Sequence, residues 1–257
     1  MVKVREMDIE FSHHYAQTLE AAKGPAWRYN EAKPCGVNYN SILLAGLYDA
    51  HHRTFRDYRR ETAEIVDMLD LKPNATIIDM GCGTGAFTIH AAPHYRTVHA
   101  VDVSRAMLHR TRRKARKAGL DNVQFHHGGF LTYDHEAEPA DAIVTVAALH
   151  HLPDFWKSVG LYRLASMLKP GGRLYLFDVV FSFDIAHYEA RIKHFVRTAG
   201  VEMGPSGRIE SETHCRDEYS TCDWIMAGLL ERAGFEITTT GRQDEFFTSY
   251  LCTKRSV

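Results

Sequence analysis

The sequence predicts an α/β fold in which a mostly parallel sheet carries helices on both of its faces. Between residues 59 and 180, apolar runs of strand length alternate with segments in which apolar residues recur at helical spacing. The first of these runs ends in a loop with three alternating glycines, Gly81, Gly83 and Gly85. Two further strand-like segments close the chain. Such an alternation is typical of consecutive βαβ units.

The elements are expected in a regular order. The first helix is predicted over 59–71, where Ile65, Met68 and Leu69 share a face and Pro73 follows as a stop signal. The strands are then expected at 76–80, 97–101, 122–126, 141–146, 173–179, 235–240 and 246–253. The helices between them are expected at 86–92, 104–118, 156–168 and 223–233. Gly119 and Gly234 follow two of these helices, as C-terminal glycines commonly do.

Two segments fall outside this alternation. Residues 1–58 are polar and aromatic without a long period, and residues 180–220 are polar and longer than a crossover helix requires. We expect a single domain, with an N-terminal cap at 1–58 and a core at 59–257 that carries a cap insertion at 180–220. These two segments are predicted to choose the substrate.

Composition limits the classes of protein to consider. With 257 residues and 45% hydrophobic content, the chain can bury one substantial core. Its net charge of −1 gives no general attraction to nucleic acid or membranes, and no apolar run is long enough to cross a bilayer. The N-terminus lacks the apolar segment of a signal peptide. Five scattered cysteines without a C-x-x-C pair indicate reduced thiols and a cytoplasmic protein.

The glycine loop is the most informative motif. Glycine accepts positive φ and lets the backbone press against a ligand. Gly81, Gly83 and Ala86 also fit a dinucleotide pattern, which aims helix amides at a pyrophosphate. However, Asp79 lies two residues before the loop and would repel a pyrophosphate. A carboxylate suits the ammonium and sulfonium of S-adenosylmethionine, so we favour that ligand over NAD.

A second acidic residue supports a nucleoside ligand. Asp102 ends the second predicted strand, 21 residues after Gly81. An acid at this point of a nucleotide-binding βαβ unit accepts the ribose hydroxyls. NAD and S-adenosylmethionine both carry such a ribose, so Asp102 does not choose between them. The alternative is an ordinary surface aspartate that caps the helix starting near Ser104.

Taken together, these motifs resemble a class I S-adenosylmethionine-dependent methyltransferase of the broad small-molecule group (type 11/25-like). The matching pieces lie at 79–85 (DMGCGTG), 102–104 (DVS), 147–152 (AALHHL) and 168–175 (LKPGGRLY). The resemblance implies a Rossmann-like, doubly wound, seven-stranded sheet whose last strand is antiparallel. It also implies S-adenosylmethionine as methyl donor, with S-adenosylhomocysteine as product. The cofactor-binding residues it implies are Asp79, Gly81, Cys82, Gly83, Gly85, Asp102, Val103, Gly129, Phe130 and Ala147.

The sequence departs from the family at one of these positions. Family members often carry an acid after the third strand that accepts from the adenine amine, and here Gly129 occupies that place. Backbone groups or water are then expected to take over the contact. Val103 and Phe130 are interpreted either as apolar cover for the adenine or as core residues.

Three side chains are candidates for catalysis. His150 and His151 end the fourth predicted strand, where an imidazole with an ordinary pKa near ~6.5 suits a general base. Packing is the alternative role, and methyl transfer relies largely on alignment. Tyr48 resembles a tyrosine that many small-molecule members place near the methionine end of the donor. Trp27 and Tyr29 are read as an aromatic lid or as packing.

Sixteen histidines raise the question of a metal site. The chain has no H-E-x-x-H spacing, and adjacent histidines are expected to point to different faces of a strand or helix. We therefore predict no metal.

A nucleic-acid partner is not expected either. Seven Lys or Arg residues within 105–117 are interpreted as a solvated helix face rather than an RNA-binding surface. The function predicted is methyl transfer to a small molecule, with no membrane partner and with a homodimer allowed. The alternatives are a tRNA or protein methyltransferase, a non-catalytic S-adenosylmethionine-binding regulator, and a nucleotide-dependent oxidoreductase.

Overall fold

The structure is a computed structural model that describes residues 25–36 and 56–256. Its strands are β1 (Thr76–Met80), β2 (Thr97–Asp102), β3 (Val123–His127), β4 (Ala140–Val146), β5 (Leu168–Phe181), β6 (Thr221–Cys222), β7 (Phe235–Arg242) and β8 (Phe247–Lys254). The α-helices are α3 (Tyr58–Leu69), α4 (Ala86–Ala91), α5 (Arg105–Lys117), α6 (Asp154–Met167), α7 (Tyr188–Asp217) and α8 (Asp223–Arg232). A short 3-10 helix, η2 (Leu149–His151), follows β4.

The sheet has the order β3-β2-β1-β4-β5-β8-β7. Strands β1 to β5 run parallel, and β8 is inserted antiparallel between β5 and β7. This confirms the mostly parallel, Rossmann-like sheet with an antiparallel last strand. The two-residue strand β6, which pairs with the end of β5, was not expected. The strand order reverses between β1 and β4, and open α/β sheets bind their ligands at the carboxyl ends of the strands at such a point.

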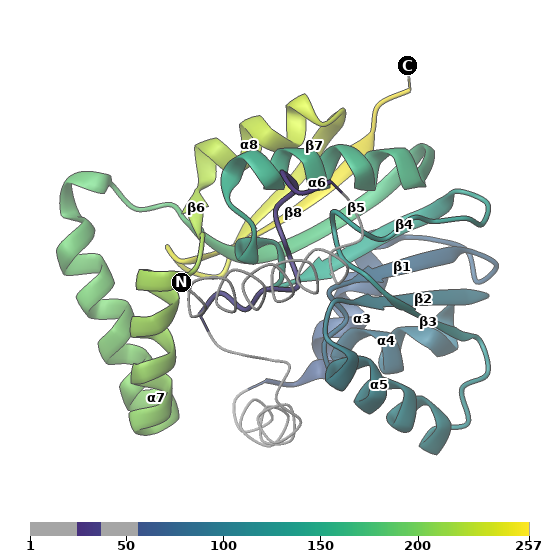
Figure 1. The fold of residues 1–257 in the computed structure, drawn as a ribbon, viewed down its shortest axis with the longest axis horizontal. Coiled ribbons are helices and arrows are strands. Elements are labelled where there is room, and N and C mark those ends of the chain that lie inside the picture. Colours follow the sequence, from purple (N-terminus) through teal and green to yellow (C-terminus); the bar gives the residue numbers. More distant parts are fainter. Residues whose placement is uncertain (1–24, 37–55, 257) are drawn as a thin grey trace, which may run out of the picture.

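Two hydrophobic cores cover the two faces of the sheet. Ile77 packs in the cluster under α3 and α4, whereas its neighbour Ile78 packs in the cluster that includes residues of α6 and α8. Figure 1 shows α3, α4 and α5 on one side of the sheet, and α6 and α8 on the other. The period-two alternation of strand side chains therefore supplies both layers at once.

Most of the predicted insertion at 180–220 is helix α7. Gly204 breaks this helix with φ 71° and ψ −163°, and Pro205 follows it. The two arms lie side by side, because a Cβ on Gly200 would lie 3.4 Å from the side chain of Arg208. Figure 1 shows α7 extending away from the sheet. The C-terminal arm ends next to the site at Glu218, and a role of this segment as substrate cap remains a prediction.

The described part of the predicted N-terminal cap, residues 25–36, lies against α6. Trp27 stacks on Trp156 with ring centroids 6.5 Å apart, and Tyr29 lies 6.3 Å from the same ring. Aromatic contacts of this kind add to the energy of simple burial. Within the described residues, no helix combines the length and apolar content that a bilayer span requires.

Replacing Leu161 tests the core under α6. This side chain is fully buried in the larger cluster, and its neighbour Tyr162 is 68% exposed on the same helix. We expect Leu161→Ala to lower the free energy of unfolding by about 2–5 kcal/mol, because it leaves a cavity. Tyr162→Ala, the matched control, should change it by less than about 1 kcal/mol. Urea denaturation followed by circular dichroism measures both, and equal effects would contradict this packing.

Candidate functional site

The glycine loop follows β1 at the carboxyl edge of the sheet. Gly81, Gly83 and Gly85 have φ of 76°, 53° and 85°, all in the region that favours glycine. A Cβ on Gly81 would lie 2.5 Å from the Cβ of Ala148, and one on Gly85 would lie 2.6 Å from Thr111. At Gly83 a Cβ would meet nothing within 4 Å. Two of the glycines are thus required by packing, and the third faces open space.

Asp79 and Asp102 both lie buried at this loop, with 3% and 8% of their surface exposed. The hydroxyl of Thr88 donates to Asp79 Oδ2. The amides of Gly83 and Ser104 donate to the two oxygens of Asp102 at 2.8 and 2.7 Å. Asp102 therefore positions the loop and also the start of α5, where Ser104 is the N-cap.

Burial makes the ionised form of both carboxyls unfavourable in free energy. Burial raises the pKa of Asp79 to about 7, and the charge of Asp102 adds to this effect. Burial raises the pKa of Asp102 to about 6, although its two backbone hydrogen bonds oppose the rise. The hydroxyl and the two amides that donate to these carboxyls are uncharged. A cationic group bound at this loop would therefore stabilise the charged carboxylates.

The remaining expected cofactor residues surround the same edge. Val103 lies next to Gly129, because a Cβ built on Gly129 would lie 2.6 Å from Cγ1 of Val103. Phe130 packs in the core next to Gly160 of α6, so at this loop it offers mainly its backbone. Cys82 is buried among Ala100 and Leu108, and it too reaches the loop surface mainly through its backbone.

Ala147 shows backbone strain that the sequence analysis did not foresee. Its φ is 52°, a conformation that costs a residue with a Cβ on the order of 1 kcal/mol. Its amide donates to the carbonyl of Phe177 at 2.8 Å, which holds the chain in this turn. The turn leads directly from β4 into η2, which carries both histidines. Strain of this sort at the end of a strand marks a position that the surrounding structure fixes.

His150 lies buried between two carboxylates. Its Nδ1 lies 2.5 Å from Asp178 Oδ1, and its Nε2 lies 3.2 Å from Glu218 Oε2. Burial by itself lowers the pKa of His150, but the two carboxylates outweigh it and raise that pKa to about 10. Glu218 also contacts His214 Nδ1 at 2.5 Å. At neutral pH His150 is therefore protonated and held between two carboxylates. Because it already carries its proton, it is poorly suited to act as a general base.

His151 has the opposite character. Burial, together with the charge on His150, lowers the pKa of His151 to about 3, so its imidazole is neutral over the physiological range. Cys35 Sγ lies 3.5 Å from its Nδ1, and the hydroxyl of Tyr29 donates to its carbonyl at 3.5 Å. The two adjacent histidines therefore differ in charge, and His151 is the better candidate for a general base. Tyr48, the third expected catalytic residue, lies outside the described residues.

The expectation that adjacent histidines point to different faces is wrong here. His150 and His151 sit in the 3-10 turn η2 rather than in a strand, and their ring centroids lie 4.2 Å apart. Both rings reach Glu218, with candidate ligand atoms of the three residues all within 4.8 Å of one another. Such a group has the donor types for a divalent metal. However, His150 already pairs with a carboxylate at each ring nitrogen, so the described residues satisfy it as a protonated imidazole.

Sequence reasoning missed several residues that the fold brings to this edge. Glu218 reaches His150 from the end of α7, where the amide of Tyr219 donates to the carbonyl of His150 at 2.9 Å. Glu31 reaches the loop after β3 from the N-terminal segment. No local pattern marks Glu31 or Glu218, because each acts far from its sequence neighbours.

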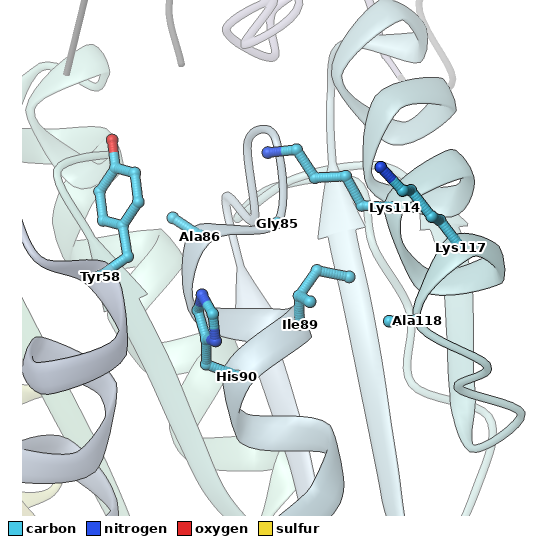
Figure 2. Close-up of a pocket in the computed structure, with 8 residues that line it drawn as sticks. All are labelled: Tyr58, Gly85, Ala86, Ile89, His90, Lys114, Lys117 and Ala118. Atoms are coloured by element: carbon cyan, nitrogen blue, oxygen red, sulfur yellow. The ribbon is translucent and has the colours of Figure 1, made fainter. Parts of the chain in front are cut away.

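A surface hollow of about 370 Å³ lies on the helix side of the glycine loop. Figure 2 shows His90 and Ile89 on one side of it, with Lys114 and Lys117 on the other. It touches the loop at Gly85 and Ala86, and neither Asp79 nor Asp102 lines it. Of the expected cofactor residues, Gly85 alone lines this hollow, so the hollow is not the place where the two acids lie.

Comparisons with known proteins agree with this geometry. A family model described as a methyltransferase domain matches residues 77–172. An uncharacterised methyltransferase from Geobacillus sp. (strain WCH70) is 29% identical over 198 residues, which cover 75% of this chain and 83% of that protein. A 27-O-demethylrifamycin SV methyltransferase from Amycolatopsis mediterranei is 29% identical over 223 residues, covering 76% of this chain and 81% of that protein.

The solved structures agree on the fold. An S-adenosylmethionine-dependent methyltransferase from Clostridium acetobutylicum superposes with a TM-score of 0.62 at 14% identity, covering 83% of this chain and 98% of that chain. The segment matched by the family model includes residues 77–80 of β1, the glycine loop, Asp102 and the two histidines of η2. Residues 77–172 thus match a methyltransferase domain, and the chain as a whole is similar in sequence to methyltransferases and in fold to S-adenosylmethionine-dependent ones.

Proposed function

We propose that this enzyme transfers the methyl group of S-adenosylmethionine to a small-molecule acceptor. The observation that carries the proposal is the pair of buried acids, Asp79 and Asp102, at an intact glycine loop. Their raised pKa values mean that the folded chain holds two carboxyls in a place that favours a cationic ligand. The donor of this family has such a cation, whereas the pyrophosphate of NAD is negative.

Different residues at this edge would bind different parts of the methyl donor, S-adenosylmethionine. When bound, S-adenosylmethionine supplies an electrophilic methyl group on a sulfonium and leaves as S-adenosylhomocysteine. Asp79 and the glycine loop would hold its methionine end. Asp102 would accept from its ribose, since each of its oxygens has a lone pair beyond the amide that it already binds. Val103 and the loop at Gly129 would border its adenine.

The residues around η2 would bind the methyl acceptor. His151, neutral and half-buried, is suited to take the proton of an acceptor that arrives protonated. His150, fixed between Asp178 and Glu218, would position the turn and set the local charge. A small acceptor is supported by the near-zero net charge of the chain and by the relative named for a rifamycin derivative. Tyr29 and Cys35 narrow the space above His151.

Calorimetric titration with S-adenosylmethionine, S-adenosylhomocysteine and NAD tests the donor. Micromolar binding of the first two without NAD supports the proposal, and binding of NAD alone overturns it. Screening metabolite extracts with a labelled methyl donor then tests the acceptor class. Labelling of bulk tRNA that weakens as salt is added would replace the small molecule with RNA, because phosphate contacts release counterions. Donor binding without any methylated product would favour the non-catalytic alternative.

A prediction for the glycine-loop acids concerns Asp79→Asn. Because burial raises the folded pKa of Asp79 to about 7, ionising this group costs stability as the pH rises from about 4 to 7. The uncharged variant avoids that cost, so the ligand-free protein should melt about 2–4 °C higher at pH 8, with the gain shrinking toward pH 4. The same variant should bind S-adenosylmethionine at least about 10-fold more weakly.

Differential scanning fluorimetry and calorimetry measure these two effects. Wild-type affinity for the donor should itself fall below about pH 7, as Asp79 takes up a proton. The control is Glu236→Gln, an exposed acid on β7 away from the loop. Unchanged donor affinity in Asp79→Asn would remove this residue from the site.

A separate prediction concerns the charge of the two histidines. Nitrogen-15 NMR of the imidazoles should show His150 protonated on both nitrogens at pH 7, and His151 neutral down to pH 5. Glu218→Gln removes one of the two carboxylates and should lower the pKa of His150 by about 1 to 3. Glu236→Gln should leave it unchanged. A His150 that titrates near its ordinary value of about 6.5 in the wild type would contradict the arrangement.

A further inference from the structure

The loop after β3 has a glycine at position 129 for a reason that the structure makes visible. A Cβ on Gly129 would lie 2.5 Å from Oε2 of Glu31 and 2.6 Å from Val103. A Cβ does not come this close to a non-bonded atom, so a larger residue at 129 would displace the carboxylate of Glu31 or the side chain of Val103. The carboxylate of Glu31 thus takes the space in which a side chain of residue 129 would begin.

Three hydrogen bonds hold this carboxylate on the loop. The amide of Leu131 is shared between Oε1 and Oε2 at 3.0 and 3.1 Å, and the hydroxyl of Thr132 donates to Oε1 at 2.6 Å. Arg163 fixes the same loop from α6, because it donates to the carbonyls of Phe130 and Tyr133. Glu31 therefore binds a rigid partner, although the two lie about 100 residues apart in the chain.

The two oxygens of Glu31 are not used equally. Oε1 accepts the Thr132 hydroxyl and the shorter of the two contacts from the Leu131 amide, and Oε2 accepts the longer one. The backbone of Thr132 also acts on this carboxylate and lowers its pKa. A carboxylate offers about four acceptor sites, so Oε2 has room for another donor. Burial raises the pKa of Glu31 despite its hydrogen bonds, which means that a further donor would stabilise the charged form.

The topology indicates which donor meets Oε2. Asp102, at the end of β2, is placed for the ribose, and β3 is the next strand outward in the sheet. A base attached to that ribose on the side away from the glycine loop lies over the loop after β3. Glu31 Oε2 and Val103 border this space together at Gly129. The exocyclic amine of adenine is the donor on the outer edge of such a base.

We propose that Glu31, carried by the N-terminal segment 25–36, accepts a hydrogen bond from the adenine amine of the methyl donor and replaces an acid at position 129. The proposal rests on the proposed use of S-adenosylmethionine. The same segment places Cys35 and Tyr29 against His151, so it crosses from the adenine end of the site to the acceptor end.

The test compares two ligands that differ only at the amine. S-adenosylhomocysteine carries the adenine amine, and S-inosylhomocysteine carries a carbonyl oxygen in its place. Wild type should bind the first at least about 10-fold more tightly, since a charged acceptor bonded to the amine is worth about that much. Glu31→Ala should bind both weakly and about equally. Lys33→Ala, on the exposed side of the same segment, is the control and should keep the wild-type preference.

Two further variants separate recognition from simple loss of structure. Glu31→Gln keeps an oxygen for Leu131 and Thr132 but turns an amide NH₂ toward the base, so it should prefer S-inosylhomocysteine. Gly129→Asp alone should bind the adenine ligand poorly, because two carboxylates would compete for one space. Combined with Glu31→Ala, the same change should restore the preference for the amine.

Each outcome has a definite meaning. If wild type binds S-adenosylhomocysteine and Glu31→Ala keeps the full preference over the inosine ligand, the role of Glu31 is overturned and the proposed function stands. If Glu31→Ala weakens both ligands by the same factor without changing a wild-type preference, Glu31 only supports the loop, and the proposal is likewise overturned. If wild type binds neither ligand, the proposed function and this inference both fail.

Discussion

The carboxylate of Asp102 is the contact on which the arrangement of the site depends. It joins the end of β2 to the amide of Gly83 in the loop after β1, and to the amide of Ser104 at the start of α5. Three elements thus meet on one buried group. Because the group is buried, its ionised form is costly and its pKa rises to about 6. In the proposed function, a cationic ligand at the loop would offset that cost.

Buried carboxylates also lie around η2, but there the protein itself supplies the compensating positive charge. Asp178 and Glu218 are buried as well, but His150 lies between them and supplies a positive charge. The positive charge on His150 then helps to keep His151 neutral one residue later in the chain. A single turn, η2, therefore presents one charged and one uncharged imidazole, and the strained backbone at Ala147 directs the chain into it. The two adjacent histidines thus differ in charge because their surroundings differ.

The N-terminal segment adds a further, partly buried acid, Glu31, at the loop after β3. Glu31 bonds to the loop after β3, and the aromatic rings of Trp27 and Tyr29 bind the segment to Trp156 of α6. Residues from three distant parts of the chain, namely 25–36, the end of α7 and the ends of the parallel strands, converge on one edge. The sheet alone would leave that edge open to water.

Much of the fold was determined by local sequence. Short apolar runs such as 76–80, Gly119 after α5 and the glycine loop each encode their conformation within a few residues, so the order of strands and helices was predictable. Asp79 and Asp102 were predictable for the same reason, because each ends a strand next to a recognisable turn. Only the tertiary structure decided the partners of Gly129 and His150. Glu31 and Glu218 reach them across long stretches of chain, and a contact of that kind leaves no pattern in either segment by itself.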